Sequence, residues 1–382
     1  MRALRFHAAR DLRIEDVAEP SDPRDGEVVV RVTTCGICGT DLHEYAAGPI
    51  VTPVEPHPLT GAQNPQILGH EFAGDVVAVG PGVTRVSEGD RVSIMPLAYC
   101  GRCAYCRRGL QHLCATMACV GLSHAWGGMG EFAAVAEYQI VPLPEGVSYH
   151  QGALIEPTAV AAYGVERSGV APGDRVLVTG AGPIGALAVL CARVAGASIV
   201  YVSEPNAARR QRADSLGVAT VLDPTAVDVP ALLREETDGL GVDVAIECSG
   251  HPNGFSAAIH SLRRRGTLAQ TGLFVGEATV EPMLWALNDL TIVGTWCYWV
   301  YDFDRIAAQI AAGDLPVDRV VTSEVELDGA PDAFARLASG AADEIKVLID
   351  QRGREVSDES AGLRGASPGG RLRTRDSGDR GG

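Results

Sequence analysis

The sequence predicts an α/β protein in which a β-rich region is joined to a doubly wound parallel sheet. With 382 residues, the chain is longer than a single hydrophobic core usually supports, so we expect two domains. Up to about residue 155, short β-branched runs are separated by turns, which indicates short strands. Beyond that point, apolar strands alternate with helical stretches, which is typical of a parallel sheet covered by helices.

The character of the sequence changes along the chain. Residues 27–32 and 74–80 are β-branched runs, and residues 89–92 form a turn that leads into another strand. After about residue 296 the pattern is mixed again, and it ends in an apolar strand at residues 345–349. These changes divide the chain into residues 1–155, 156–295, 296–350 and 351–382.

The tail differs from the rest of the chain in composition. Residues 351–382 contain eight glycines and seven arginines, with few large apolar side chains. Such a segment buries too little apolar surface to offset the entropy of ordering it. We expect it to be disordered.

The parallel sheet is predicted from residue 175 onward. Residues 175–179 form a short apolar strand, and a helix with an apolar face follows it. Further strands are expected at residues 198–202, 242–246 and 267–271.

A glycine-rich turn, Gly180-Ala-Gly-Pro-Ile-Gly185, joins the first of these strands to its helix. Glycines there let the backbone approach a pyrophosphate, whose charge is stabilised by the helix N-terminus. The motif is weak alone, and an ordinary glycine turn is the alternative, but here an acid, Glu204, also follows the second strand. The expected dinucleotide site consists of Gly180, Gly182, Pro183, Ile184, Gly185, Glu204 and Arg209.

The acid predicts which dinucleotide binds. Glu204 is placed to accept hydrogen bonds from the adenosine ribose hydroxyls, and its charge would repel a 2′-phosphate. We therefore expect NAD. Arg209 and Arg210 lie close enough in sequence to keep NADP as an alternative.

The composition excludes several partners and chemistries. The formal charge is −16, from 32 basic and 48 acidic residues, which argues against a nucleic-acid partner. No apolar run approaches a membrane span, and the first residues lack the apolar segment of a secretory signal, so we expect a cytoplasmic protein with no membrane partner. Lys346 is the only lysine, which excludes a Walker A motif, a Tyr-x-x-x-Lys pair and Schiff-base chemistry.

Four cysteines with short spacing predict a structural zinc site. Four thiolates can enclose one Zn²⁺ tetrahedrally and leave no open position. An iron–sulfur centre is the rival, but the bacterial ferredoxin motif has three residues before its last cysteine and a proline after it. Here seven residues precede the last cysteine and Ala115 follows it, so zinc is favoured. The predicted ligands are Cys100, Cys103, Cys106 and Cys114.

A second metal site would have to be assembled from distant segments. The segment Cys35-Gly-Ile-Cys38-Gly-Thr40-Asp41-Leu-His43 offers thiols, a hydroxyl and an imidazole. His70-Glu71 and Glu156 add an imidazole and two carboxylates. A catalytic zinc needs about three protein ligands and one open position. Each residue also has a structural explanation, since His70 could be a core histidine and Glu156 a charge at a helix start.

These segments carry a resemblance to a known family. Over roughly residues 1–350, the chain resembles the zinc-containing medium-chain alcohol dehydrogenases. Within that family it looks most like the (R,R)-2,3-butanediol dehydrogenases, next to the sorbitol and threonine dehydrogenases. The motifs are Cys35-Gly-Ile-Cys-Gly-Thr-Asp-Leu-His-Glu-Tyr45, Gly48-Pro-Ile50, His57-Pro-Leu-Thr-Gly61, Gly69-His-Glu-Phe-Ala-Gly74 and Gly152-Ala-Leu-Ile-Glu-Pro157.

The resemblance implies a fold and a set of zinc ligands. It implies a GroES-like catalytic domain that is discontinuous in sequence, with residues 1–155 and a return at residues 296–350, around a Rossmann domain at residues 156–295 that binds NAD. It also implies that Cys38, rather than Cys35, and His70 bind the catalytic zinc. Glu156 is the favoured third ligand, with Glu71 as a neighbour that exchanges with it.

The family chemistry implies roles for the remaining residues. Zinc lowers the pKa of a bound alcohol, and the nicotinamide accepts a hydride. Thr40 would accept the alcohol proton and pass it through the nicotinamide ribose toward His43. An exposed loop histidine without a catalytic role is the alternative for His43.

The expected substrate is a small alcohol or ketone. The best candidate is (R,R)-2,3-butanediol with acetoin as its product, and sorbitol or another polyol and L-threonine are the alternatives. A zinc-free quinone reductase would lack both cysteine groups, and a non-enzymatic NAD-binding regulator would need no open metal site. The family implies a homodimer or homotetramer.

Overall fold

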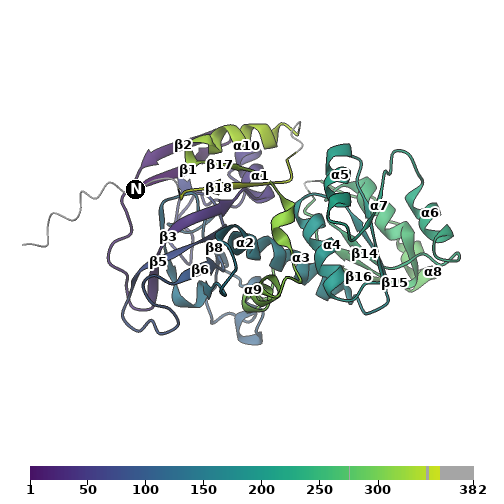
Figure 1. The fold of residues 1–382 in the computed structure, drawn as a ribbon, viewed down its shortest axis with the longest axis horizontal. Coiled ribbons are helices and arrows are strands. Elements are labelled where there is room, and N and C mark those ends of the chain that lie inside the picture. Colours follow the sequence, from purple (N-terminus) through teal and green to yellow (C-terminus); the bar gives the residue numbers. More distant parts are fainter. Residues whose placement is uncertain (275, 341–343, 353–382) are drawn as a thin grey trace, which may run out of the picture. The chain divides into compact units, whose positions relative to one another are not determined.

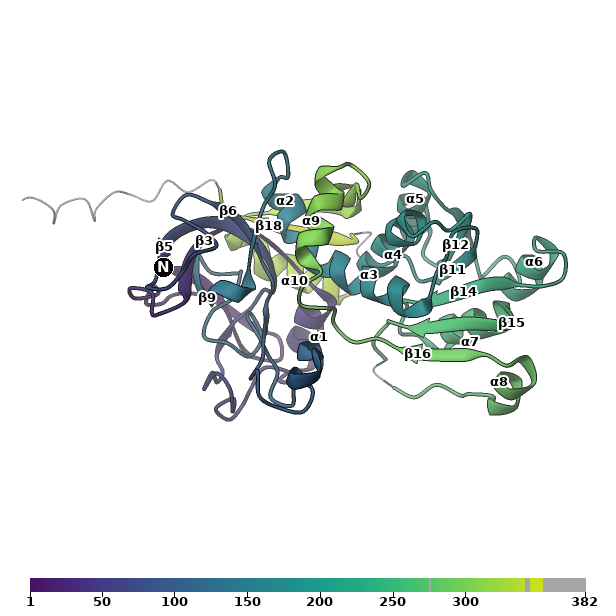
Figure 2. The same ribbon diagram turned by 90° about the horizontal axis from the view of Figure 1, so that it is seen from below.

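The computed structural model describes residues 1–274, 276–340 and 344–352, which are drawn in colour in Figures 1 and 2. Met1–Gln351 form one compact unit. Disorder is predicted for residues 351–382. Of these, residues 353–382 lie outside the described part of the chain. Gln351, the first residue of the tail, donates hydrogen bonds to backbone oxygens of Thr33 and Gly128.

The β-rich region is built on a seven-stranded sheet. Its order is β10-β6-β5-β3-β18-β17, and β9 also pairs with β3. A three-stranded sheet of order β2-β1-β4 and the pair β7-β8 complete the region. The strands are β1 (Arg2–Ala8), β2 (Asp11–Asp16), β3 (Glu27–Gly36), β4 (Gln66–Ile67), β5 (Glu71–Val79), β6 (Arg91–Ile94), β7 (Leu97–Ala98), β8 (Ala118–Cys119), β9 (Phe132–Ala136), β10 (Ile140–Pro142), β17 (Val321–Val325) and β18 (Lys346–Asp350).

Strand register brings three distant segments to one point. Gly36, the last residue of β3, lies opposite Glu71, the first residue of β5. On its other side, Gly36 lies opposite Leu348 of β18. Cys38, His70 and Lys346 each lie within two residues of these positions, so the register gathers them.

The second sheet is six-stranded and parallel throughout. Its order is β13-β12-β11-β14-β15-β16, which is that of a dinucleotide-binding doubly wound fold. This confirms the predicted fold class. The strands are β11 (Arg175–Thr179), β12 (Ile199–Ser203), β13 (Thr220–Leu222), β14 (Val242–Glu247), β15 (Leu262–Gln270) and β16 (Thr291–Gly294), and most of them lie side by side in Figure 2.

Helices cover both faces of this sheet because its strands are apolar on both sides. Val176 and Val178 of β11 pack into one core with helices α3 and α4, whereas Leu177 between them packs into a second core with α6 and α7. The helices are α1 (Gly39–Ala47), α2 (Tyr149–Ala153), α3 (Ile155–Ser168), α4 (Pro183–Val194), α5 (Ala207–Ser215), α6 (Val229–Glu235), α7 (Pro252–Ser261), α8 (Pro282–Asn288), α9 (Phe303–Ala311) and α10 (Ala330–Ala338).

Strand boundaries differ from the predictions where pairing is irregular. The predicted strand at residues 267–271 is the regular part of β15, which begins at Leu262. Between Leu262 and Thr267 the register against β14 shifts, and Arg265 has a φ of 59°. Among the described residues, no helix is both long and apolar enough to cross a membrane.

Candidate active site and metal sites

The first candidate ligand, Cys38, stands at the start of helix α1. Its extended backbone makes it the N-cap, and its N–H donates a hydrogen bond of 3.0 Å to Oδ2 of Asp41. Cys35 lies three residues earlier, inside β3, and is fully buried. Burial raises the pKa of the Cys35 thiol well above its usual range, so it is unsuited to supply a thiolate.

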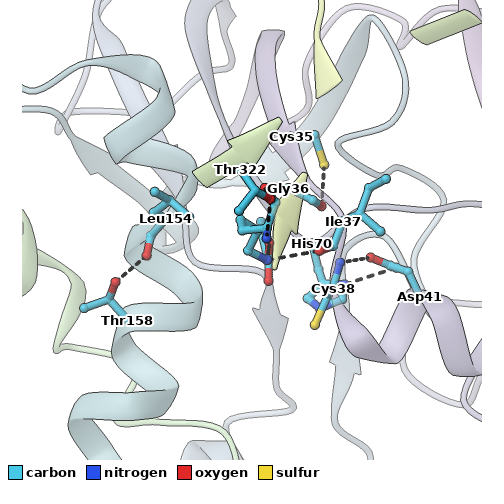
Figure 3. Close-up of polar contacts among 11 residues, drawn as sticks. Cys35, Gly36, Ile37, Cys38, Asp41, His70, Leu154, Thr158 and Thr322 are labelled. Carbon is cyan, nitrogen blue, oxygen red and sulfur yellow. Dashed lines mark hydrogen bonds and ion pairs between the residues drawn. The ribbon is translucent and has the colours of Figure 1, made fainter. Parts of the chain in front are cut away.

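Cys38 is met by Glu71, the first residue of β5, and by His70 directly before it. One ligand atom from each of the three residues lies within 4.8 Å of the others. Oδ1 of Asp41 lies 3.5 Å from Nδ1 of His70, so one carboxylate contacts both the Cys38 backbone and the His70 ring (Figure 3). A carboxylate behind a histidine fixes the orientation of the ring, as in many zinc sites.

Glu71 is also held by the only lysine. Nζ of Lys346 lies 2.5 Å from Oε2 of Glu71 and 3.1 Å from the backbone oxygen of Ile37. Both side chains of the pair are 1% exposed. Although burial opposes it, the carboxylate of Glu71 raises the pKa of Lys346, so the lysine is charged.

The fourth expected residue, Glu156, begins helix α3 and is buried. Its carboxylate is not part of the group in which the ligand atoms of Cys38, His70 and Glu71 lie within 4.8 Å of one another. It is still near enough for the charges of His70, Glu71 and Lys346 to affect its pKa. Burial raises the pKa of Glu156 to about 7. A carboxyl group of this kind can act as a metal ligand or hold a proton near neutral pH.

One buried carboxylate oxygen in this cluster, Oε1 of Glu71, is without a hydrogen-bond partner among the described residues. Buried polar groups are normally paired, so an unpaired carboxylate oxygen beside a thiol and an imidazole suits a bound cation. The donor set of sulfur, nitrogen and carboxylate oxygen is the one that zinc prefers.

The two expected proton-transfer residues lie on the same helix as Cys38. Thr40 and His43 are three residues apart on α1, which places them on one side of the helix. Thr40 is half-buried and His43 is exposed.

The four cysteines of the predicted structural site come together. The Sγ atoms of Cys100, Cys103, Cys106 and Cys114 lie within 4.8 Å of one another. All four are free thiols. Backbone N–H groups of Cys106 and Ala115 lower the pKa of the Cys103 thiol to about 6, which favours the thiolate form that binds zinc. The group fits one closed zinc site.

The glycine turn lies between β11 and α4. Gly180 has a φ of +90°, and a Cβ there would lie 2.9 Å from the backbone of Ser249. A Cβ on Gly185 would lie 2.0 Å from the oxygen of Gly180, so neither position accepts a side chain. A Cβ on Gly182 would meet nothing within 4 Å. This leaves open space at the N-terminus of α4, where a pyrophosphate fits.

Glu204 follows β12 and is tied to the same turn. Its Oε2 accepts a hydrogen bond of 2.7 Å from the N–H of Ala181, and its Oε1 accepts one of 2.9 Å from the N–H of Asn206. The acid therefore braces the turn. Arg209 lies one turn into α5, and its Nε is buried without a partner in the described part of the chain.

The fold and these groups of side chains define a zinc-binding dehydrogenase. Residues 24–145 match the alcohol dehydrogenase GroES-like domain, and residues 183–312 match the zinc-binding dehydrogenase domain. The chain belongs to the zinc-binding medium-chain alcohol dehydrogenase family, and it is a zinc-dependent alcohol or polyol dehydrogenase.

Butanediol dehydrogenases are among its most similar relatives. The chain is 39% identical over 330 residues to (R,R)-butanediol dehydrogenase of Bacillus subtilis, covering 86% of this chain and 93% of that protein. The crystal structure of 2R,3R-butanediol dehydrogenase from B. subtilis matches with a TM-score of 0.85 and 37% identity, covering 91% of this chain and 99% of that one. The chain is also 31% identical to B. subtilis sorbitol dehydrogenase, covering 91% and 97% of the two chains.

Sequence reasoning missed two features of these sites. The sequence assigns no role to Lys346, whereas in the structure it is the buried ion-pair partner of Glu71. A single charge inside the apolar strand at residues 345–349 was the available signal. Glu247, at the end of β14, is fully buried, and it accepts hydrogen bonds from the N–H of Ser249 at 2.8 Å and from Nε2 of Gln270 at 2.7 Å. It holds together the two loops beside the glycine turn.

Proposed function

We propose that this enzyme oxidises a small vicinal diol, with (R,R)-2,3-butanediol and acetoin as the best substrate and product, and NAD as the cofactor. The observation that carries the proposal is the similarity to butanediol dehydrogenases over most of the chain. The cluster of Cys38, His70 and Glu71 supports it, because its chemistry fits a catalytic zinc.

The proposed zinc ligands are Cys38, His70 and a carboxylate. Zinc, when bound, lowers the pKa of the substrate hydroxyl. Asp41 orients the His70 ring and holds the Cys38 backbone. Glu156 is the proposed third ligand, and Glu71 is the neighbour that exchanges with it. The contact between Glu71 and Lys346 favours Glu156 over Glu71 as the third ligand, since one oxygen of Glu71 already contacts the ammonium group of Lys346.

The proposed proton path begins at Thr40. With NAD bound, the hydroxyl of Thr40 would accept the proton of the substrate alcohol, and His43 would release it to solvent. The exposure of His43 suits release of the proton to solvent. NAD, when bound, would supply the acceptor for the hydride of the carbinol carbon, so that loss of the proton and the hydride would give a ketone and NADH.

A second hydroxyl on the substrate has suitable partners in this cluster. Oε1 of Glu71 is buried without a partner among the described residues, and Glu156 lies nearby. A site that hydrogen-bonds this hydroxyl rejects a substrate without it, because its own polar group would remain unpaired. This favours a vicinal diol over a simple secondary alcohol.

Polyols form the second candidate substrate class. Sorbitol is also a vicinal diol, and the 31% identity to a sorbitol dehydrogenase supports it. L-Threonine is less suited, since its carboxylate needs a cation and Lys346 is occupied by Glu71.

The test is a comparison of kcat/KM for the 2,3-butanediol isomers, 2-butanol, sorbitol and L-threonine under one set of conditions. We expect (R,R)-2,3-butanediol to give the highest value and 2-butanol a much lower one. A tenfold advantage for sorbitol or threonine would overturn the diol assignment and leave the zinc chemistry intact.

The proposed assembly is a homodimer or homotetramer in which the parallel sheets join at their edges. Strand β16 has a paired neighbour on one side only among the described strands. Exposed apolar side chains lie on it or near it in sequence, including Ile292, Leu287 and Trp296. An exposed strand edge with apolar side chains is suited to pairing with a second copy. Light scattering during gel filtration measures the subunit number.

A further inference from the structure

A third group of metal-binding side chains lies outside both sites described above. His150, Glu324 and Asp350 each place one ligand atom within 4.8 Å of the others. They come from three separate elements, namely helix α2, strand β17 and strand β18. The proposed mechanism uses none of the three residues.

Strand pairing brings the two carboxylates together. Strands β17 and β18 are parallel, and Glu324 lies opposite Leu348. Asp350 follows Leu348 by two residues, so its side chain points to the same face of the sheet. Asp350 is also four residues beyond Lys346, or about 13 Å along an extended strand, which separates this group from the candidate catalytic cluster.

Helix α2 supplies the imidazole. It contacts the short turn of helix at residues Val317–Val320 that precedes β17, and Nε2 of Gln151 lies 3.4 Å from Oδ1 of Asp318 in that turn. Nδ1 of His150 lies 3.4 Å from Oε1 of Glu324. The side chain of His150 is 21% exposed and that of Glu324 is 45% exposed, so an ion from solvent can reach both.

The distance between His150 and Glu324, and the donor atoms of all three residues, suit zinc. Two ligands that each lie about 2.0–2.1 Å from a tetrahedral zinc ion lie about 3.3–3.4 Å from each other. One imidazole and two carboxylates are ligands that zinc accepts, whereas magnesium and calcium prefer oxygen ligands alone. The formal charge of −16 on the chain also favours binding of a cation.

We propose that His150, Glu324 and Asp350 form a third, peripheral site for zinc, with water completing the coordination. Such an ion would link α2 to β17 and β18. Because Glu156 follows α2 closely and Lys346 begins β18, the site would fasten two segments that carry residues of the catalytic cluster. Its partly exposed ligands and its lack of thiolates make it weaker than a four-cysteine site.

The experiment compares zinc bound per chain in the holoenzyme and in variants after equilibrium dialysis against the same free zinc concentration. We expect Glu324→Gln and His150→Gln to bind one zinc fewer per chain than the wild type. Glu324→Gln is the principal variant, because the exposure of Glu324 allows the change without disturbing the core. The matched control is Glu326→Gln, an exposed glutamate two residues away, which should keep the wild-type count.

Cobalt added to enzyme that holds two zinc ions per chain gives a second readout, because the weaker third site is then empty. An ion held by nitrogen and oxygen shows weak d–d absorption without an intense sulfur-to-cobalt band in the near ultraviolet. We expect this weak spectrum in the wild type and its loss in Glu324→Gln. Equal zinc counts in the wild type and both variants, or a cobalt spectrum that is unchanged in Glu324→Gln, would overturn the proposal. These comparisons are differences between variants, so they do not depend on the substrate of the enzyme.

Discussion

The ammonium group of Lys346 contacts the carboxylate of Glu71 across 275 residues of sequence, directly beside His70. The pair is buried, and the lysine is the only one in the chain. Desolvating two charges costs free energy, which such a pair recovers only with good geometry and further hydrogen bonds. Lys346 meets that condition through its second contact, with the backbone oxygen of Ile37.

Replacing Lys346 by methionine should therefore destabilise the protein. The change leaves a buried carboxylate without its cation, which costs about 3–5 kcal/mol in the free energy of unfolding. The measurement is denaturant unfolding at fixed zinc concentration. The double variant Glu71→Gln/Lys346→Met removes both charges and should recover most of the loss. If Lys346→Met were as stable as the wild type, the ion pair between Glu71 and Lys346 would make no such contribution to the free energy of unfolding.

The four-cysteine group should hold one zinc ion per chain. Cys103→Ser should lose about one zinc and destabilise the fold, because metal binding at a structural site is part of the folding free energy. Metal analysis gives the count, and thermal unfolding gives the stability. Cys191→Ala is the control, since this cysteine lies outside both cysteine-containing groups. Iron in the wild type, or an unchanged zinc count in Cys103→Ser, would contradict the assignment.

Cofactor preference should depend on the charge of Glu204. We expect the wild type to prefer NAD over NADP by roughly a hundredfold, which needs only about 3 kcal/mol. Glu204→Ser should lower this preference for NAD over NADP. It should also weaken binding of both cofactors, because the hydrogen bond from the N–H of Ala181 is lost. Glu204→Asp keeps the charge and should keep the preference. Dissociation constants from fluorescence titration give the ratio, and a wild-type preference for NADP would refute this role.

The hydroxyl of Thr40 should be needed for proton transfer. Thr40→Val should lower kcat by about 10²–10⁴-fold, the usual contribution of a positioned proton-transfer group. Thr40→Ser retains a hydroxyl and should keep most of the activity. Both variants should bind zinc as the wild type does, because Thr40 is not a proposed ligand. An active Thr40→Val enzyme would place the proton path elsewhere.

Local patterns in the sequence predicted the parallel sheet and two of the residue groups. The run at residues 175–179 and the glycine turn after it are local features, and the structure has β11 and the turn at those positions. The four cysteines also lie within fifteen residues, so their spacing alone restricts the geometry they can adopt. Short-range spacing is reliable because few backbone conformations connect such residues.

The catalytic cluster was only partly predictable. The sequence indicated Cys38, His70 and the two glutamates as candidates, but it did not rank Glu71 against Glu156 by geometry. In the structure, Glu71 joins the group within 4.8 Å, and it also binds a lysine from the last strand. The charge of Lys346 in an apolar strand was visible in the sequence, but its partner was not.

The sequence by itself determined the fold class, the glycine turn and the four-cysteine group, because each depends on residues that are close together in the chain. Only the tertiary structure decided which side chains meet Cys38. Strand β3 pairs with β5 on one side and with β18 on the other, so residues 36, 71 and 348 become neighbours. Such pairing depends on the packing of the whole sheet, and a one-residue shift in register would turn every side chain of a strand to the opposite face.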